Sequence, residues 1–483
     1  MASNFRAKFA PPLSDEVWAT YFPDAGNGIS VTNNTHITWN DPNDANFAVD
    51  VNFQKPWIQH LTNMWGVSTN GGVKYYLMDN EHSIWFSTHQ DVHPVGPTMQ
   101  EIYNDIITYG GMVKSVDPHA LVMGPEEWGW NGYFWSGYDQ QWAGQHNDFN
   151  VNDFPDRGTN GGMDYMPWLL NQLHLHDTAA GVRTLDYFTL HCYPQEGNVS
   201  GSAVDPATEL LRNQTTRQFW DSNYLDPSWI NSYIDLIPRM KNWVATYYPG
   251  TKIGVTEYNW GAEPSINGAT AQADILGIFG RQGLDLATRW TVPAGGTPTY
   301  LAIKMYRNYD GGKSTFGDTS VLTTVPNPDD VSAFGAVRSS DGAMTLMVVN
   351  KDITNASPFN AAISNFTSTG TAQRWQLTST SVITALTNLP LTNGILSDTV
   401  PSQSITLYVL ASMPQSTLVA GPPRTDGNFQ FTLHGQSGQT WIVQSSPDLI
   451  SWQDISTNQL VGTQTNIVVP GGTIRKYYRT RTP

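Results

Sequence analysis

The sequence predicts an α/β protein of the β/α-barrel kind, followed by a β-sandwich domain and a small C-terminal all-β module. Two observations lead to this prediction. Between about residues 73 and 306, short apolar runs of strand length alternate with helical stretches, the pattern of βαβ units around a parallel sheet. From about residue 314 the helical stretches stop, and strands follow one another with turn residues between them, as in sandwiches.

The composition is that of a large, acidic chain rich in aromatic rings. Its 483 residues are enough for more than one domain. Lysine and arginine number 25 against 41 aspartates and glutamates, and the net charge of −16 repels nucleic acids and anionic membranes. The sequence has no apolar run long enough to span a bilayer. We therefore expect neither nucleic acid nor a membrane as a partner, and we expect a monomer.

The expected elements of the barrel region alternate along the chain. A helix is expected from about 47 to 65, because Phe47, Val51, Ile58, Leu61 and Trp65 share one helical face. Further helices are expected at 97–116, 163–174, 228–247 and 271–279. Loops are expected at 129–162 and at 195–226, and the second of these allows a short helical piece. Five apolar runs are expected to be strands, at 73–78, 120–124, 185–192, 252–256 and 300–306.

The remainder of the chain is expected to be all-β. Strands are predicted at 332–338, 343–350, 374–378 and 404–411, and Pro422-Pro423 marks a linker before a last group of strands within 428–483. The expected domains are therefore 1–313, 314–413 and 414–483.

Two strands end in a glutamate flanked by aromatic residues. Asn80 and Glu81 follow the first strand, and Glu257 ends the fourth. In a β/α barrel such positions face the active site, and a pair of carboxyl groups is what glycoside hydrolysis requires. The alternatives stay open at this point, because Asn-Glu can simply close a strand and Glu257 can pair with an arginine. Glu126 and Glu127 also follow a strand and are rival candidates.

Other polar and aromatic residues are candidates for the same mouth. His191 and Tyr193 lie between the two glutamate strands and can orient Glu257, touch substrate, or serve only as rim residues. Five aromatic residues can pave a sugar cleft or fill the core: Trp128, Trp229, Tyr233, Trp260 and Trp290.

Three patterns concern metals or reactive thiols. The oxygen-rich stretch Asn40–Asp44 suits a helix cap or a hard cation such as Ca²⁺. His89 and His93 lack further ligands at zinc spacing and favour a loop role. Cys192 is the single cysteine; it excludes an intramolecular disulfide, and its apolar strand favours a buried structural thiol.

Four motifs in order, YYLMDNEHSIWFSTHQDVHP, LHCYP, KIGVTEYNWG and KMYRNYDGGKSTFGDTS, resemble glycoside hydrolase family 44. The resemblance implies a TIM-like (β/α)8 barrel with a β-sandwich and a retaining endo-β-1,4-glucanase, with xylan or xyloglucan as further substrates. It implies Glu81 as the acid/base and Glu257 as the nucleophile. It matches Trp229, Tyr233 and Trp290 to aromatic positions of the cleft, and Asp41 and Asp44 to a structural calcium site.

The chain departs from the family in two respects. His82 stands where the family has a proline, and only five barrel strands are recognised, with the Glu81 strand first rather than fourth. We therefore expect a chain that is N-terminally truncated relative to the family, from an extracellular, secreted protein whose signal is absent from this sequence. The C-terminal module is similar to small β domains appended to secreted bacterial proteins, with sugar binding or a spacer role implied.

Three hypotheses follow. The first is an endo-acting β-1,4-glucanase that cleaves a β-glucan polysaccharide with Glu81 and Glu257 and needs no cofactor for catalysis, apart from a structural Ca²⁺. The second is an inactive carbohydrate-binding protein on an incomplete barrel. The third is an enzyme that acts primarily as a xylanase.

Overall fold

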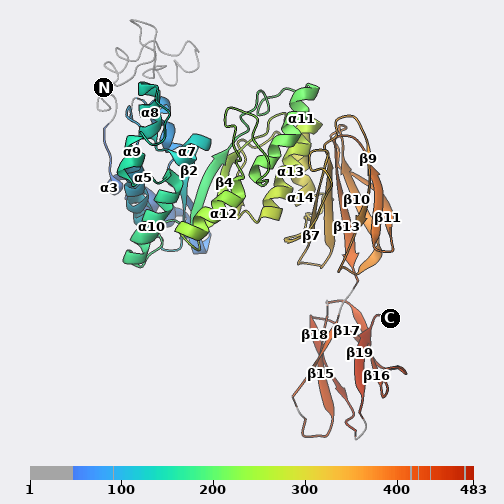
Figure 1. Ribbon diagram of the computed structural model, residues 1–483. Helices are drawn as coiled ribbons and strands as arrows, with labels where there is room; N and C mark the ends of the chain where they lie inside the picture. The colour runs from blue at the N-terminus through green and yellow to red at the C-terminus, as the bar shows by residue number, and fades with distance from the viewer. Residues whose placement is uncertain (1–46, 91, 414–415, 423, 436, 473–474) are drawn as a thin grey trace.

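The structure, a computed structural model, describes residues 47–90, 92–413, 416–422, 424–435, 437–472 and 475–483. Along these residues an α/β region comes first, an antiparallel β-sandwich packs beside it, and a small group of strands ends the chain (Figure 1).

The α/β region is built on a five-stranded, wholly parallel sheet. Its strands follow one another in sequence order, so that the sheet is a TIM-like but partial β/α structure within the described residues. The strands are β1 (Tyr75–Leu77), β2 (Leu121–Glu127), β3 (Tyr187–Cys192), β4 (Lys252–Tyr258) and β5 (Leu286–Ala287).

The central strands are buried on both faces, as the apolar runs predict. All six residues of β3 are buried, and so are six of the seven in β2. The same expectation is wrong for β1, where Tyr75 is 37 % and Leu77 51 % exposed. In the described sheet β1 pairs only with β2, and an edge strand has one neighbour fewer to cover its side chains.

Helices connect and cover the strands. The first helix, α3, begins after Asp50, whose side chain accepts hydrogen bonds from two backbone N–H groups, and α5 begins with a capping box formed by Thr98 and Glu101. The helices that confirm predictions are α3 (Val51–Trp65), the continuous run α5 (Met99–Asp105), η4 (Ile106–Gly110) and α6 (Gly111–Val116), and then α10 (Tyr165–Ala180) and α13 (Ile266–Gln282).

The stretch 129–162, which we expected to be an irregular loop, contains helices, and the stretch 195–226 contains the helical piece that we allowed for there. Short helices start at local caps such as Ser136 and Asp205, whose side chains accept backbone N–H groups, and these signals are too short to stand out from a polar sequence. The additional elements are η2 (Ser68–Asn70), η3 (His82–Ile84), α4 (Trp85–Thr88), α7 (Trp130–Phe134), α8 (Gly137–His146), α9 (Pro155–Thr159), α11 (Pro206–Thr215) and η5 (Thr216–Phe219).

The strand predicted at 300–306 is wrong, because these residues form helix α14 (Pro298–Arg307). Thr297 caps the helix with Pro298 in its first turn, and the buried residues Ala302, Met305 and Tyr306 have helical spacing. The fifth strand is instead the two-residue β5, which pairs with β4 through Gly254 and Val255.

The helix predicted at 228–247 begins later, as α12 (Leu236–Tyr247). Residues before it form a loop in which the Ser228 N–H donates to the Asp226 carboxylate and Leu225 bridges to Tyr233. Asn231 and Asp235 have positive φ, which ends any helical run there. Trp229 and Tyr233 therefore lie on a loop and not on a helix.

The β-sandwich follows the α/β region and shares its core. On β8, Met347 and Val349 join the large core that includes α13, while Leu346 and Val348 face the interior of the sandwich. The strands are β6 (Thr319–Val321), β7 (Val331–Val337), β8 (Met344–Asn350), β9 (Ser357–Ala362), β10 (Ser368–Leu377), β11 (Thr384–Thr392), β12 (Ile395–Val400) and β13 (Ser404–Ser412).

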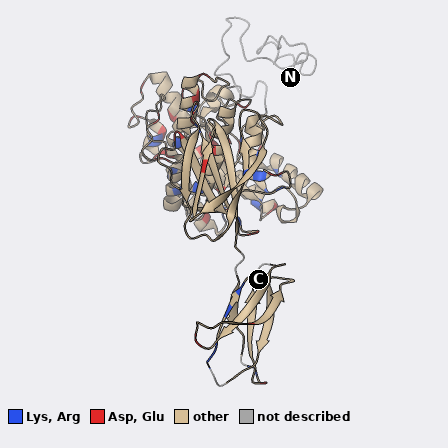
Figure 2. Cartoon of the chain, turned by 90° about the vertical axis from the view of Figure 1, so that its right-hand side faces the viewer, with Lys and Arg blue, Asp and Glu red and all other residues tan. Residues whose placement is uncertain are grey.

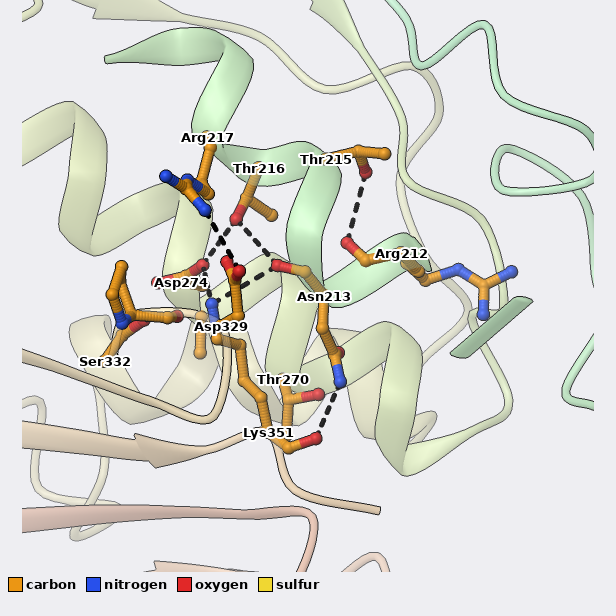
Figure 3. Close-up of polar contacts among 12 residues, drawn as sticks. Arg212, Asn213, Thr215, Thr216, Arg217, Thr270, Asp274, Asp329, Ser332 and Lys351 are labelled. Carbon is orange, nitrogen blue, oxygen red and sulfur yellow. Dashed lines mark hydrogen bonds and ion pairs between the residues drawn. The ribbon is translucent and has the colours of Figure 1, made fainter. Parts of the chain in front are cut away.

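A buried polar cluster ties the sandwich to the α/β region (Figure 3). Lys351, at the end of β8, donates from Nζ to the Asp274 carboxylate of α13 at 2.9 Å, and both side chains are at most 2 % exposed. The Lys351 carbonyl accepts from Asn213 Nδ2 at 2.6 Å, and Thr216 donates to Asp274 at 2.7 Å. Helices α11 and α13 are thereby held against the first strands of the sandwich.

The last strands form a separate small unit (Figure 1). Two three-stranded sheets enclose their own apolar core, which includes Phe431, Trp441 and Val443. The strands are β14 (Thr417–Ala420), β15 (Phe429–His434), β16 (Thr440–Ser446), β17 (Gln453–Gln459), β18 (Gln464–Val469) and β19 (Tyr477–Arg481).

Basic residues are scattered in the view of Figure 2 rather than gathered on one surface. Among the described residues, none of the helices combines the length and the apolar character that crossing a bilayer requires.

Candidate active site

The carboxyl ends of the parallel strands meet at one edge of the sheet, and Glu81 lies there just after β1. Its backbone is in the left-handed region with φ of 51°, and its N–H donates to the Glu126 carbonyl of β2 at 2.9 Å. Asn80 precedes it, is exposed, and accepts from Trp85 Nε1 at 2.8 Å through its backbone carbonyl. The buried His82 side chain packs on Trp85.

Glu257 reaches the same edge from β4. The parallel register pairs it with His191 of β3, so that the two side chains leave neighbouring strands at one level. Tyr193, just beyond β3, donates its hydroxyl to Glu257 Oε2 at 2.8 Å. This hydrogen bond fixes the carboxylate, and together with burial it raises the pKa of Tyr193 far above its ordinary value, so that the phenol stays a donor.

His191 lies between the two glutamates. Its Nδ1 is 2.9 Å from Glu81 Oε1 and 3.6 Å from Glu257 Oε2. One carboxylate oxygen of Glu81, one of Glu257 and a ring nitrogen of His191 all lie within 4.8 Å of one another. The glutamate side chains are 25 % and 18 % exposed and open to solvent, whereas His191 is 1 % exposed.

The carboxylates around His191 favour the protonated form of its ring. Burial by itself lowers its pKa, but the carboxylates of Glu126, Glu81 and Glu257 outweigh burial and raise the pKa to about 9. A ring that is protonated on both nitrogens donates hydrogen bonds. In this arrangement the His191 ring can therefore donate to Glu81 from Nδ1.

The rival carboxylates of β2 lie behind this group. Glu126 is 1 % exposed and accepts from Thr189 and Thr256, while Glu127 is fully buried and accepts from Ser83 at 2.7 Å. Burial raises the pKa of Glu127 to about 8, so this side chain is neutral at pH 7. Neither side chain is exposed enough to meet a polysaccharide, which leaves Glu81 and Glu257 as the accessible pair.

Three of the predicted aromatic residues are exposed on loops that lie next to the strands in sequence. Trp229 and Tyr233, on the loop before α12, are 54 % and 51 % exposed, and Trp229 Nε1 donates to Gln195 at 3.2 Å. Trp290 follows β5, is 56 % exposed, and is held by backbone hydrogen bonds to Tyr258 and to the Asn259 side chain.

Two further predicted residues are less exposed. Trp128 is half-buried and lines a small cavity with Tyr193 and Gln195. Trp260 is 2 % exposed and donates to Thr215 at 2.9 Å, so the prediction that it binds substrate is wrong. The β4 strand turns this ring into the core, where it packs on Phe219 at 4.9 Å.

Other predictions have mixed outcomes. Cys192 is buried, and burial holds its pKa well above the ordinary value, as expected of a structural thiol. Asp41 and Asp44, the predicted calcium ligands, lie outside the described residues. Sequence reasoning missed Thr189, Thr256 and Gln195, whose roles depend on neighbouring strands.

A parallel β/α sheet with two accessible carboxylates at its carboxyl edge and exposed aromatic rings beside them defines the class of β/α glycoside hydrolases. The model of glycoside hydrolase family 44 matches residues 4–196. The chain is 55 % identical to CelM2, described as a bifunctional glucanase-xylanase from a metagenome library, and the structures share a TM-score of 0.80 over 85 % of this chain and 78 % of that one.

Two further relatives extend the comparison. A family 44 endoglucanase from Clostridium acetobutylicum is 31 % identical over 74 % of this chain and 70 % of its own, with a TM-score of 0.67. Endoglucanase A of Paenibacillus lautus is 33 % identical over 63 % of this chain and 43 % of its own length. The chain belongs to glycoside hydrolase family 44. It spans less than half the length of the curated relatives it matches.

Proposed function

We propose that this protein is a retaining endo-β-1,4-glucanase that acts by double displacement, with Glu257 as nucleophile and Glu81 as acid/base. One observation carries the proposal: oxygens of the two carboxylates lie within 4.8 Å of each other. Retaining glycosidases hold their carboxyl groups about 5–5.5 Å apart, whereas inverting enzymes need about 6.5–9.5 Å to admit a water molecule.

In the first step Glu257 attacks the anomeric carbon, and Glu81 protonates the leaving oxygen. The bond from the anomeric carbon to that oxygen breaks while the glycosyl ester forms on Glu257. In the second step Glu81 takes a proton from water, which attacks the same carbon and releases Glu257. The Tyr193 hydroxyl, 2.8 Å from Glu257 Oε2, supports the assignment because it orients an ionised carboxylate for attack.

The substrates that we propose are soluble cellulose derivatives, mixed-linkage glucan and xyloglucan. The exposed rings of Trp229, Tyr233 and Trp290 suit stacking on sugar faces along such chains. Xylan is a second candidate substrate, since the relative with 55 % identity is described as a glucanase-xylanase. A polysaccharide cannot cross a membrane, and we propose that the protein acts outside the cell without a catalytic cofactor.

The decisive experiment is to follow hydrolysis of a cello-oligosaccharide by proton NMR. The first product that accumulates is expected to be the β-anomer, and a soluble cellulose derivative is expected to lose viscosity well before most of its reducing ends appear. An α-anomeric first product would contradict the two-step mechanism. Binding to glucan with no new reducing ends would instead support a carbohydrate-binding protein. Parallel rates on xylan rank the two substrates.

A substitution of Trp229 by alanine tests the aromatic rim. We expect KM for a long oligosaccharide to rise about 5- to 30-fold, which corresponds to ~1–2 kcal/mol of lost stacking. Because Trp229 does not touch the carboxylates, kcat is expected to change little. Trp57→Ala is the matched control, since this tryptophan is 57 % exposed on α3, and its kinetics should equal those of the unsubstituted protein. An unchanged KM in Trp229→Ala would remove this residue from the binding surface.

A further inference from the structure

The Glu126 carboxylate is buried beneath the active site, yet the two-step mechanism above does not use it. Glu126 is the extra residue of a β-bulge in β2, since Pro125 pairs with Thr189 and Glu127 pairs with the next residue, Leu190. Its φ is 61°, an unusual value for a glutamate. The bulge gives Glu126 a side-chain direction that regular alternation along β2 would not.

Both oxygens of this carboxylate have donors. Oε1 accepts from Thr189 Oγ1 at 2.6 Å, and Oε2 accepts from Thr256 Oγ1. Thr256 is itself the extra residue of a bulge in β4, between the residues that pair with Leu190 and His191. The Nε2 atom of His191 lies 3.4 Å from Glu126 Oε2, and both side chains are 1 % exposed.

The groups that face His191 are almost all acidic. Glu81 approaches Nδ1 from the segment before η3, Glu257 approaches it from β4, and Glu126 approaches Nε2 from β2. Glu127 of β2 lies nearby but is neutral at pH 7. On the backbone side, the His191 carbonyl accepts from the Tyr133 hydroxyl of α7. Ionised carboxylates only accept hydrogen bonds, so a ring with carboxylates at both nitrogens is held with a proton on each.

We propose that Glu126 is a positioning residue whose buried carboxylate holds His191 as a doubly protonated imidazolium, with its Nδ1–H donated to Glu81 and its charge beside Glu257. This assignment rests on the proposed function. The single positive charge lies beside both carboxyl groups, whose oxygens are within 4.8 Å, and it stabilises Glu257 while that residue is ionised and Glu81 once Glu81 has given up its proton. Glu126 also accepts the Glu81 N–H through its backbone carbonyl, so one residue fixes both the acid/base and the ring beside it.

The sign of the pH effect follows from the charge. A raised pKa means that His191 keeps its proton below about pH 9 and loses it above. Replacing Glu126 by glutamine removes the negative charge at Nε2 but keeps the size of the side chain. The imidazolium is then expected to lose its Nε2 proton at lower pH, and the neutral ring no longer supplies a positive charge beside Glu81 and Glu257.

The test is Glu126→Gln, followed by NMR titration of the histidine rings without substrate and by kcat/KM between pH 5.5 and 9. In the unsubstituted protein we expect both His191 ring nitrogens to be protonated at pH 7. In Glu126→Gln the pKa of His191 is expected to fall below about 8, because the carboxylate 3.4 Å from Nε2 is gone. Each unit of pKa is a tenfold change in the protonation equilibrium. We expect kcat/KM to be about tenfold below that of the unsubstituted protein at pH 8 but within about twofold at pH 5.5.

Two controls separate the outcomes. Glu127→Gln changes a neighbouring buried carboxyl that is already neutral and should leave the His191 titration unchanged. Glu126→Asp keeps the charge, and its His191 should retain most of the raised pKa.

The proposal would be overturned if the pKa of His191 were the same in Glu126→Gln as in the unsubstituted protein. A loss of kcat/KM that is equal at every pH would also overturn it. If Glu126→Gln does not fold, a neutral His191 ring in the unsubstituted protein at pH 7 would still overturn it. If that protein hydrolyses no glucan, the titration still decides the role of Glu126, so the two failures are distinguishable.

Discussion

Replacing Glu257 by glutamine is expected to lower kcat on a soluble cellulose derivative by at least about 10³-fold. The amide has almost the shape of the carboxylate and can still accept the Tyr193 hydroxyl, so the fold is expected to survive. It cannot form the glycosyl ester, because a neutral amide is a poor nucleophile at the anomeric carbon. Initial rates of reducing-end release measure the effect.

Glu81→Gln is the informative partner of this variant. Losing a general acid costs about 10²–10⁴-fold when the leaving group is a sugar hydroxyl. In an aryl glycoside with an acidic phenol, the phenolate leaves without being protonated. Formation of the glycosyl-enzyme by Glu81→Gln is therefore expected to recover on that substrate. Glu257→Gln is expected to stay inactive on the aryl glycoside and on the cellulose derivative. Added azide is expected to give a β-glycosyl azide with Glu81→Ala and an α-glycosyl azide with Glu257→Ala. Glu127→Gln serves as the matched control, and equal activity of Glu257→Gln and this control would refute the assignment.

Replacing Lys351 by methionine is expected to lower the free energy of unfolding by about 3–5 kcal/mol. The ammonium group is 1 % exposed and lies 2.9 Å from the Asp274 carboxylate, which would be left as a buried, uncompensated charge. The Lys351 carbonyl would keep its bond from Asn213, since the backbone is unchanged. Urea unfolding followed by tryptophan fluorescence measures the loss.

The double variant Lys351→Met with Asp274→Leu isolates the ion pair. Removing both charges leaves no unpaired ion, so the double variant is expected to be more stable than Lys351→Met alone. Lys252→Met, on an exposed side chain at the start of β4, should stay within about 0.5 kcal/mol of the unsubstituted protein. A double variant as unstable as the sum of the single ones would show that the pair is not coupled.

The sequence alone determined the first four strands around the site and their order. Continuous apolar runs indicated β2, β3 and β4, because strands buried on both faces need apolar residues at every position. The positions of Glu81 and Glu257 at strand ends placed them at one edge of the sheet, because the carboxyl ends of parallel strands meet there, but left Glu126 and Glu127 as rivals. The same reasoning placed all five members of the aromatic set in one group and could not tell the exposed Trp229 from the buried Trp260.

Only the tertiary structure decided which groups surround the pair. Glu126 turns toward His191 because of a bulge in β2, and a bulge changes the alternation on which sequence patterns depend. Helix α14 replaces the predicted fifth strand for a similar reason. A short apolar run fits the period of a strand as well as that of a helix, and here the helix cap and the packing partners of α14 decide for the helix. The charge on His191 depends on three carboxylates from three separate segments, and distances of that kind exist only in the folded chain.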